Sequence, residues 1–239
     1  MLEVHAQLSK KNFTKGRSPS ARTENQKTYI KAVIKNDIVI CQGPAGTGKT
    51  HLAIGMGVWG LRKGTIDKIV IARPTIEAGE QIGFLPGDLE AKMNPFTRPC
   101  FDELKEYATY EEIDTWQKKG SIEICPIGFM RGRTLNSAFI ICDECQNLSF
   151  RQMKMLLTRF GNNSKLVLTG DIGQSDLHKN DQGGFAYGCA LAKYISDVYN
   201  MKIAIVKLES SDNQRHPLVQ IIEEIWDNNL DKFKKSGRI

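Results

Sequence analysis

The sequence predicts an α/β fold in which a mostly parallel β-sheet is covered by helices on both faces. Short runs of apolar, β-branched residues recur along the chain, as in strands that are buried on both sides, and they alternate with segments of helical spacing. The chain has 239 residues, of which 41% are hydrophobic and 25% are charged. This length and composition fit one globular α/β domain.

The strands are predicted from their apolar content and from the turn residues that end them. The run at 68–72, for example, ends at Arg73-Pro74, where proline forces an extended backbone. The six predicted strands are residues 38–41, 68–72, 122–126, 137–142, 165–169 and 202–208.

The helices are predicted from apolar residues on one face and from capping signals. Ser149 and Gln152 form a capping box for one helix, Gly161 is expected to end it, and Pro217 suits the first turn of a last helix. The region 77–119, rich in Gly, Pro and charge, is expected to form helices and loops at the sheet edge. The apolar faces are predicted to be Tyr29, Ile30, Val33 and Ile34; Leu52, Ala53, Met56 and Gly57; Met153, Leu156, Leu157 and Phe160; and Leu218, Ile221, Ile222 and Ile225.

The first strand leads into a match to the pattern GxxxxGK[ST]. A glycine-rich turn that enters a helix directs unpaired N–H groups and the positive end of the helix dipole at a polyphosphate. Lys49 is expected to reach the β- and γ-phosphates and the Thr50 hydroxyl to hold Mg²⁺. The predicted nucleotide-binding residues include the next one in the chain, His51, and are Gly43, Pro44, Ala45, Gly46, Thr47, Gly48, Lys49, Thr50 and His51.

Acidic and polar residues follow two other predicted strands. Asp143 and Glu144 come after an apolar run, so their carboxylates should reach the phosphate pocket at the carboxyl edge of the sheet. We expect Asp143 to hold Mg²⁺ and Glu144 to act as the base for an attacking water. Asp171 follows another strand, and Gln174 is placed to contact the γ-phosphate or the water, although Asp171 alone also fits a helix-capping turn.

Phosphoryl transfer needs positive charge for its transition state, and three arginines are candidates to supply it. Arg215 precedes His216-Pro217, and Arg131 and Arg133 form the alternative pair.

The six cysteines include Cys142 and Cys145 in a CxxC pattern. No second pair or spaced histidines accompany them, so we interpret them as reduced core thiols and not as zinc ligands.

The net charge of +6 is concentrated at the two ends. Residues 1–22 contain five Lys or Arg and one Glu, and residues 231–239 contain four Lys or Arg and one Asp. Such ends are either solvated tails or attract a polyanion such as RNA or single-stranded DNA, and charge alone does not decide between these interpretations.

No apolar run approaches the roughly 20 residues that span a bilayer, and residues 1–11 lack the apolar core of a signal peptide, so we expect a cytoplasmic protein with no membrane partner.

An ordered series of motifs resembles the PhoH-like ATPases of bacteria and their viruses, which are related to the first lobe of superfamily 1 helicases. The resemblance covers residues 23–227 and rests on RTENQ, GPAGTGKT, ARPTIEAGEQIGFLPGDLEAKMNPFTRP, FMRGRTLNSAFIICDECQN, QMKMLLTRFG, LTGDIGQSDL and RHPLVQII. It implies a P-loop ATPase with a RecA-like core, a hexameric ring of identical subunits, and action on RNA or single-stranded nucleic acid. With it, the predicted organisation is a flexible basic arm (1–22), an ATPase domain (23–230) and a basic tail (231–239).

The resemblance also implies roles for individual residues. Gln26 resembles the glutamine that reads adenine, and Gln174 resembles the γ-phosphate glutamine of a GDxxQ motif. A DExQ segment is matched by Asp143, Glu144 and Gln146. Arg215 is similar to the arginine that approaches the γ-phosphate, and Arg73-Pro74-Thr75 resembles a segment that contacts the nucleic-acid backbone. Cys145 stands where the family more often carries alanine, which makes oxidation a concern if the thiol is exposed.

The leading hypothesis is a magnesium-dependent ATPase coupled to RNA or single-stranded nucleic acid, with RNA helicase activity as its sharper form. One alternative is a binding or assembly protein in which ATP controls the oligomeric state and hydrolysis serves as a timer. A second alternative is a kinase that uses the same phosphate loop. Glu144 beside Asp143 favours water as the acceptor over a kinase substrate.

Overall fold

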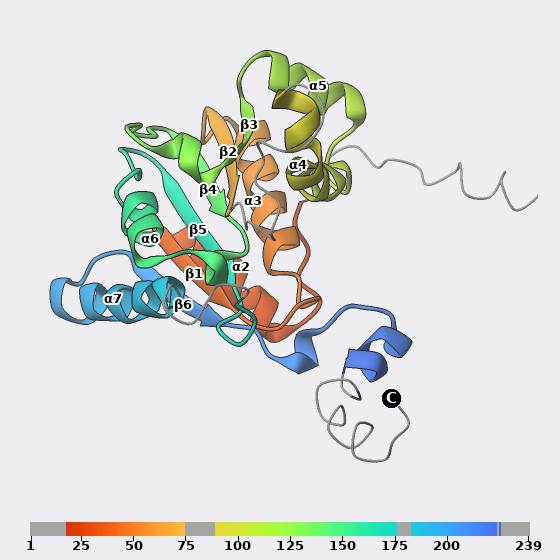
Figure 1. Cartoon of the computed structure of the whole chain (residues 1–239), viewed down its shortest axis with the longest axis vertical. Helices are drawn as coiled ribbons and strands as arrows, with labels where there is room; N and C mark the ends of the chain where they lie inside the picture. Colours follow the sequence, from red (N-terminus) through yellow and green to blue (C-terminus); the bar gives the residue numbers. More distant parts are fainter. Residues whose placement is uncertain (1–17, 75–88, 176–182, 224, 226–239) are drawn as a thin grey trace, which may run out of the picture.

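The computed structural model describes residues 18–74, 89–175, 183–223 and 225, with only the backbone described at 89–96. Its centre is a six-stranded sheet with the order β3-β2-β4-β5-β1-β6 (Figure 1). Every neighbouring pair of these strands is parallel. The strands are β1 (Ile38–Gln42), β2 (Lys68–Arg73), β3 (Ile122–Pro126), β4 (Ala138–Cys142), β5 (Lys165–Gly170) and β6 (Ile203–Lys207), which confirms all six predicted strands to within a residue or two at their ends.

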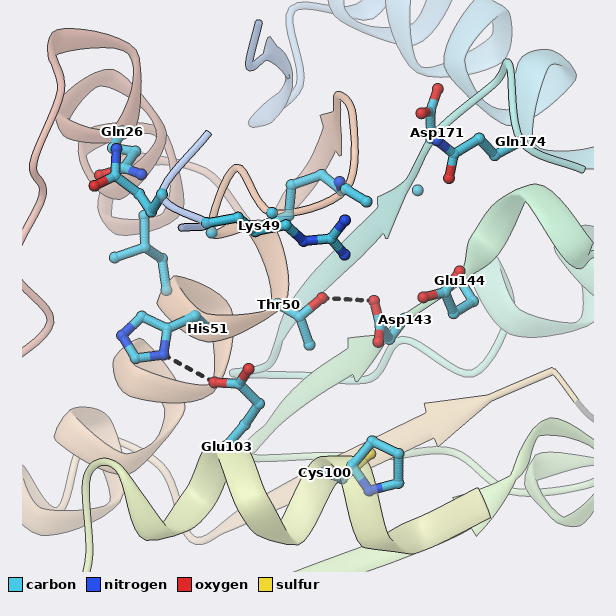
Figure 2. A pocket seen from close by; sticks show the side chains of 18 of the residues that line it. Gln26, Lys49, Thr50, His51, Cys100, Glu103, Asp143, Glu144, Asp171 and Gln174 are labelled. Carbon is cyan, nitrogen blue, oxygen red and sulfur yellow. Dashed lines mark hydrogen bonds and ion pairs between the residues drawn. The ribbon is translucent and has the colours of Figure 1, made fainter. Parts of the chain in front are cut away.

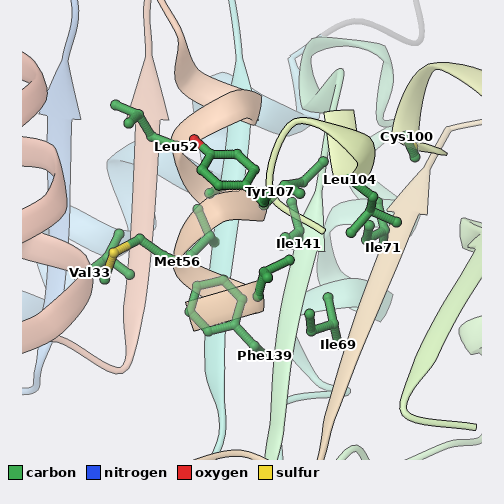
Figure 3. Close-up of a cluster of buried hydrophobic side chains, with 14 of the residues drawn as sticks. Val33, Leu52, Met56, Ile69, Ile71, Cys100, Leu104, Tyr107, Phe139 and Ile141 are labelled. Atoms are coloured by element: carbon green, nitrogen blue, oxygen red, sulfur yellow. The ribbon is translucent and has the colours of Figure 1, made fainter. Parts of the chain in front are cut away.

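Helices cover both faces of the sheet, so the predicted fold class is confirmed. One buried cluster, shown in Figure 3, joins one sheet face to α2, α3, α4 and α5, and a second joins the other face to α6 and α7. Along β4, Phe139 and Ile141 belong to the first cluster and Ala138 and Ile140 to the second, as alternating strand residues should. The helices are α2 (Glu24–Lys35), α3 (Lys49–Lys63), α4 (Leu89–Lys105), α5 (Tyr110–Lys118), α6 (Phe150–Leu157) and α7 (Gly184–Tyr199), with short 3₁₀ turns η2 (Ile127–Met130), η3 (Cys145–Asn147) and η4 (Ser210–Asp212).

Helix α6 begins as predicted but ends earlier than predicted. Ser149 and Gln152 form the expected capping box. The last helical residue is Leu157, so the prediction that Gly161 ends the helix is wrong. Beyond the helix, Phe160 forms an isolated parallel bridge with Leu135, and Gly161 N donates to Leu135 O at 3.1 Å. Pairing with the chain before β4 therefore replaces the last predicted turn.

One helix was not predicted, and the last described helix exposes apolar side chains that were predicted to form a packed face. Helix α7 was not among those predicted. Residues 217–223 are helical, with Pro217 in the first turn as predicted. Their apolar side chains are exposed, at 58% for Leu218, 50% for Ile221 and 53% for Ile222.

Among the described helices, none is long and apolar enough to cross a membrane.

Candidate nucleotide-binding site

The predicted phosphate loop connects β1 to α3 at the carboxyl edge of the sheet. Gly46 has φ +76° and Gly48 has φ +86°, backbone angles that a residue with a Cβ atom adopts only with strain. Gly48 is the N-cap residue of α3, and its first turn has no side-chain cap. The amides at the start of this 15-residue helix are therefore available to bind an anion.

The first two residues of α3 make different polar contacts. Lys49 Nζ donates hydrogen bonds to Gly43 O at 2.6 Å and to Pro44 O at 2.7 Å. Thr50 Oγ1 donates to Asp143 Oδ1 at 2.6 Å (Figure 2). Burial lowers the pKa of the Lys49 ammonium despite the acidic groups around it. The ammonium can exchange its two main-chain oxygen partners for phosphate oxygens.

Asp143 follows β4, whose five residues are all buried. Its Oδ1 also accepts a hydrogen bond from Thr169 Oγ1 at 2.7 Å. Thr169 belongs to β5, which lies between β4 and β1, so the strand order brings this acid to the phosphate loop. The Thr50 hydroxyl and the Asp143 carboxylate are oxygen donors that suit Mg²⁺, an ion that proteins usually hold through one or two carboxylates together with substrate phosphates and water. These two residues therefore fit the predicted metal ion.

Glu144 has a strained backbone and a carboxylate with one partner at each oxygen. Its φ of 58° is in the left-handed region, which costs a non-glycine residue on the order of 1–3 kcal/mol and is a frequent feature of active sites. Gln146 Nε2 donates to Glu144 Oε2 at 2.7 Å, and Arg73 Nη2 lies 3.5 Å from Glu144 Oε1. Arg73 Nε also lies 3.7 Å from Asp143 Oδ2. Arg73, expected in a nucleic-acid-binding segment, thus contacts both acids from the end of β2.

The loop after β5 is joined to the same acids through Gln146. Gln146 Oε1 accepts a hydrogen bond from Asp171 N at 3.1 Å, while its amide nitrogen holds Glu144. Gln174 N donates to Asp171 O at 3.1 Å. One buried glutamine therefore connects the predicted base to the loop that carries Gln174.

Gln26 lies at the start of α2, on the other side of the phosphate loop in Figure 2. The side chain is 3% exposed, and both ends of its amide are bonded to the main chain. Nε2 donates to Thr47 O at 3.0 Å, and Oε1 accepts from Arg22 N at 2.7 Å. An adenine base that is read by Gln26 must therefore replace these contacts or share them.

His51 and Arg215 occupy two further sides of the site. His51 Nδ1 lies 2.8 Å from Glu103 Oε2, and its ring centroid lies 4.7 Å from that of Tyr107. Arg215 pairs with Glu223. Arg133, the other candidate of the arginine pair at 131 and 133, is bound to Glu123 on edge strand β3.

These side chains surround a cavity of about 630 Å³. Five residues predicted for the site are not in its wall: Gly43, Pro44, Thr47, Arg131 and Arg133. Gln146 and Asp171, which belong to the motifs singled out in the sequence, also line it. The residues of the wall that the sequence did not indicate are Ser20, Arg22, Leu52, Pro99, Cys100, Glu103, Gly170 and Gln214. The predicted site residues that do line it are Gln26, Ala45, Gly46, Gly48, Lys49, Thr50, His51, Asp143, Glu144, Gln174 and Arg215.

The CxxC thiols belong to the buried core and not to the cavity wall. Cys142 and Cys145 are both fully buried, and Cys145 Sγ donates to Cys142 O at 3.0 Å. Burial raises the pKa of the Cys145 thiol well above its ordinary value. The thiol is therefore neither exposed nor activated for oxidation.

Comparison with known proteins identifies the family. A family model described as PhoH-like protein matches residues 19–227. This chain belongs to the PhoH family. The PhoH-like protein of Synechocystis sp. (strain ATCC 27184 / PCC 6803 / Kazusa) is 43% identical over 228 residues, and that of Bacillus subtilis (strain 168) is 44% identical over 213 residues. The alignments cover 94% and 89% of this PhoH chain but 68% and 65% of the two relatives, so the chain spans about two thirds of their length.

A solved structure supports the fold. The large terminase from a thermophilic bacteriophage aligns with this PhoH chain at a TM-score of 0.51 and 14% sequence identity, over 85% of the chain and 49% of the terminase. At this identity the likeness concerns the fold only. Together with the family match and the geometry of the phosphate loop, it identifies the chain as a P-loop nucleotide-binding domain with a RecA-like sheet.

Proposed function

We propose that this PhoH-family chain is a magnesium-dependent ATP hydrolase whose turnover is coupled to RNA or single-stranded nucleic acid. The observation that carries the proposal is the 2.6 Å hydrogen bond between Thr50 Oγ1 and Asp143 Oδ1. It joins the helix that follows the phosphate loop to the acid that follows β4 and leaves Glu144, the next residue, at the cavity wall. A phosphate-binding turn, a metal-binding pair and a candidate base thus meet in one cavity.

The proposed chemistry assigns a separate task to each group. The amides of the phosphate loop and the Lys49 ammonium bind the β- and γ-phosphates. Thr50 and Asp143 would hold Mg²⁺, which supplies charge neutralisation of the phosphate oxygens when it is bound. Glu144 orients and deprotonates the attacking water, and Gln174 and Arg215 approach the γ-phosphate. Each carboxylate oxygen of Glu144 has one partner, Arg73 or Gln146, and can accept a further hydrogen bond from that water.

Coupling to nucleic acid is proposed from charge and architecture. The positive charge of the chain is concentrated in its two terminal segments, which suits a polyanionic partner. Superfamily 1 helicases, to which the family is similar, act by closing a cleft between two lobes. The described residues contain one central sheet, so we propose that neighbouring subunits of a hexameric ring supply the second side of the cleft.

The experiment is phosphate release from ATP by the purified chain, with RNA, with single-stranded DNA, and with neither. We expect magnesium-dependent release that one of the nucleic acids accelerates. Glu144→Gln should retain ATP binding and lower turnover by at least about 100-fold, because general-base contributions are typically of the order of 10²–10⁴. Glu123→Gln is the matched control, since it removes a carboxylate that pairs with Arg133 outside the cavity wall. Normal turnover by Glu144→Gln would remove the proposed base.

The second candidate is a protein whose assembly is controlled by ATP, with hydrolysis as a timer. It is favoured by the exposed apolar side chains of Leu218, Ile221 and Ile222, which could pack against another subunit. These residues lie on the short helix that begins two residues after the cavity residue Arg215. Light scattering with ATP, ADP and no nucleotide distinguishes the candidates. An assembly state that follows the nucleotide, with a turnover rate that neither nucleic acid changes, would favour this second function over the first.

A further inference from the structure

Arg215 has a carboxylate partner that belongs to neither the phosphate loop nor the acids beside it. Arg215 Nη1 donates to Glu223 Oε1 on the helix formed by residues 217–223. The other carboxylate oxygen of Glu223 accepts from Asn213 Nδ2 at 3.4 Å. Within the described part of the chain, Glu223 is the one acidic residue that forms an ion pair with Arg215.

The segment that carries Arg215 is packed against the phosphate loop. A Cβ atom on Gly46 would lie 2.7 Å from Arg215 Cγ and 2.6 Å from Asn213 Oδ1. Gln214 N donates to Gly46 O at 2.9 Å. The aliphatic part of Arg215 therefore rests on the turn that is expected to hold the phosphates, while its guanidinium is bound to Glu223. This arrangement gives the guanidinium two possible anionic partners, Glu223 and a bound polyphosphate.

We propose that Glu223 is a positioning residue that holds Arg215 in the nucleotide-free protein and competes with the terminal phosphate of ATP for it. The proposal rests on the proposed function, which assigns Arg215 to the γ-phosphate. When ATP is bound, the Arg215 guanidinium can leave the Glu223 carboxylate and bind the γ-phosphate. ADP has no γ-phosphate and offers Arg215 no such partner. Glu223 therefore lowers the affinity for the triphosphate selectively and increases the relative occupancy of the site by ADP.

The size of the effect follows from the exposure of the ion pair. The side chains of Arg215 and Glu223 are 40% and 37% exposed, and solvent screening limits such pairs to a small contribution. Neutralising Glu223 should therefore strengthen triphosphate binding by about two- to fivefold. Binding of ADP should not change measurably.

The test is equilibrium binding of Mg²⁺ with the β,γ-imido analogue of ATP, and separately with ADP, to the full chain. The variants are Glu223→Gln, Arg215→Ala and the double variant. We expect Glu223→Gln to bind the analogue about two- to fivefold more tightly than the wild type does, and to bind ADP equally well. In the Arg215→Ala background the same substitution should have no effect, because the group that Glu223 restrains is gone.

Glu123→Gln is the matched control, because Glu123 and Arg133 are exposed by 34% and 33%, close to the values of the Glu223 pair. Glu223→Ala is a second variant that must shift the analogue affinity in the same direction, and thermal unfolding checks that each variant is folded. Unchanged or weaker analogue binding by folded Glu223 variants would overturn the proposal. An equal gain for ADP, or a gain that persists without Arg215, would overturn it as well.

The result also separates this proposal from the function on which it rests. If the wild type binds both nucleotides and the Glu223 variants match it, only the positioning role is wrong. If the folded wild type binds neither nucleotide, the proposed function fails and the role of Glu223 fails with it.

Discussion

At the scale of single residues, the site depends on a few positions whose backbone or contacts are unusual. Gly46 and Gly48 have positive φ values in the phosphate loop, and Glu144 has one without being glycine. Both oxygens of Glu144 are engaged, by Arg73 and Gln146. The proposed base is therefore held by neighbouring side chains, and its geometry depends on them as much as on its own position after β4.

Gly46→Ala should strongly weaken nucleotide binding. The new Cβ would lie 2.6 Å from Asn213 Oδ1 and 2.7 Å from Arg215 Cγ, at a φ of +76°, so the loop or the Arg215 segment must move. We expect the Kd for ATP to rise at least about tenfold, which corresponds to about 1.4 kcal/mol. Fluorescence titration with a labelled ATP analogue measures it.

Gly64→Ala is the matched control for this substitution. Gly64 has a similar φ of +66° but no atom within 4 Å of its Cβ position. It should cost only about 1 kcal/mol of stability from backbone strain and leave nucleotide binding unchanged. Equal binding by the two variants would show that the contact between Gly46 and the Arg215 segment is unimportant.

Among the elements around the cavity, α2 is tied by one buried carboxylate to the segment that leads to Arg215. Asp212 in η4 is 2% exposed and accepts hydrogen bonds from Thr23 Oγ1, from Asn25 Nδ2 at 3.0 Å and from Glu209 N at 2.7 Å. Thr23 is the N-cap residue of α2, the helix that carries Gln26. Asp212 therefore joins this helix to the segment that leads to Arg215.

The contribution of Asp212 to stability should depend on pH. Burial raises the pKa of Asp212, but the hydrogen bonds from Glu209, Thr23 and Asn25 outweigh burial and hold it below the ordinary value. Since the folded state favours the ionised form, this stabilisation is complete above the pKa of the unfolded state and is lost as the pH falls through the lower pKa of the folded state. Asp212→Asn should lower the free energy of unfolding by about 1.5–3 kcal/mol at pH 7, because hydrogen bonds to a charged group are removed.

Urea unfolding measures this loss at a series of pH values from neutral down to the lowest at which the fold persists. The difference between the wild type and Asp212→Asn should narrow at the acidic end. Asp114→Asn, which alters an exposed i,i+4 pair with Lys118, should change stability by well under about 1 kcal/mol. A difference for Asp212→Asn that is constant with pH would contradict the proposed ionic role.

Elements whose signals are local could be predicted, and those that depend on packing could not. The strands, the phosphate loop and the capping box of Ser149 were read from neighbouring residues. Helix α7 was missed because it is apolar on more than one side: Phe185 is buried, whereas Tyr187 and Tyr194 are more than half exposed. Because much of its exposed side is apolar, the amphipathic pattern that reveals a helix is weakened in this segment.

At the scale of the whole molecule, the strand order creates contacts that spacing in the sequence does not reveal. Ala72 of β2 pairs with Cys142 of β4, and this places Arg73 beside Asp143 and Glu144. A predicted strand order would have indicated that contact. The pairs of His51 with Glu103 and of Arg215 with Glu223 require the packing of helices on the sheet and the loop, which the sequence pattern alone does not specify.

The organisation of the ends stays a prediction. The basic segments 1–17 and 231–239 lie outside the described residues, and so does Thr75 of the segment expected to bind nucleic acid. Residues 18–22 of the predicted basic arm are described, and Ser20 and Arg22 line the cavity. Since part of residues 18–22 lines the nucleotide cavity, the predicted attraction of nucleic acid by the basic arm rests mainly on residues 1–17.

The proposed function requires the cavity beside the phosphate loop to bind a nucleoside triphosphate together with Mg²⁺. Isothermal titration of ATP and Mg²⁺ into the purified, folded chain tests it most directly. We expect binding at one site per chain, and at least about a tenfold loss of affinity in Lys49→Ala, since Lys49 is the ammonium at the phosphate loop. Absence of binding by the wild type, or equal binding by Lys49→Ala, would contradict it.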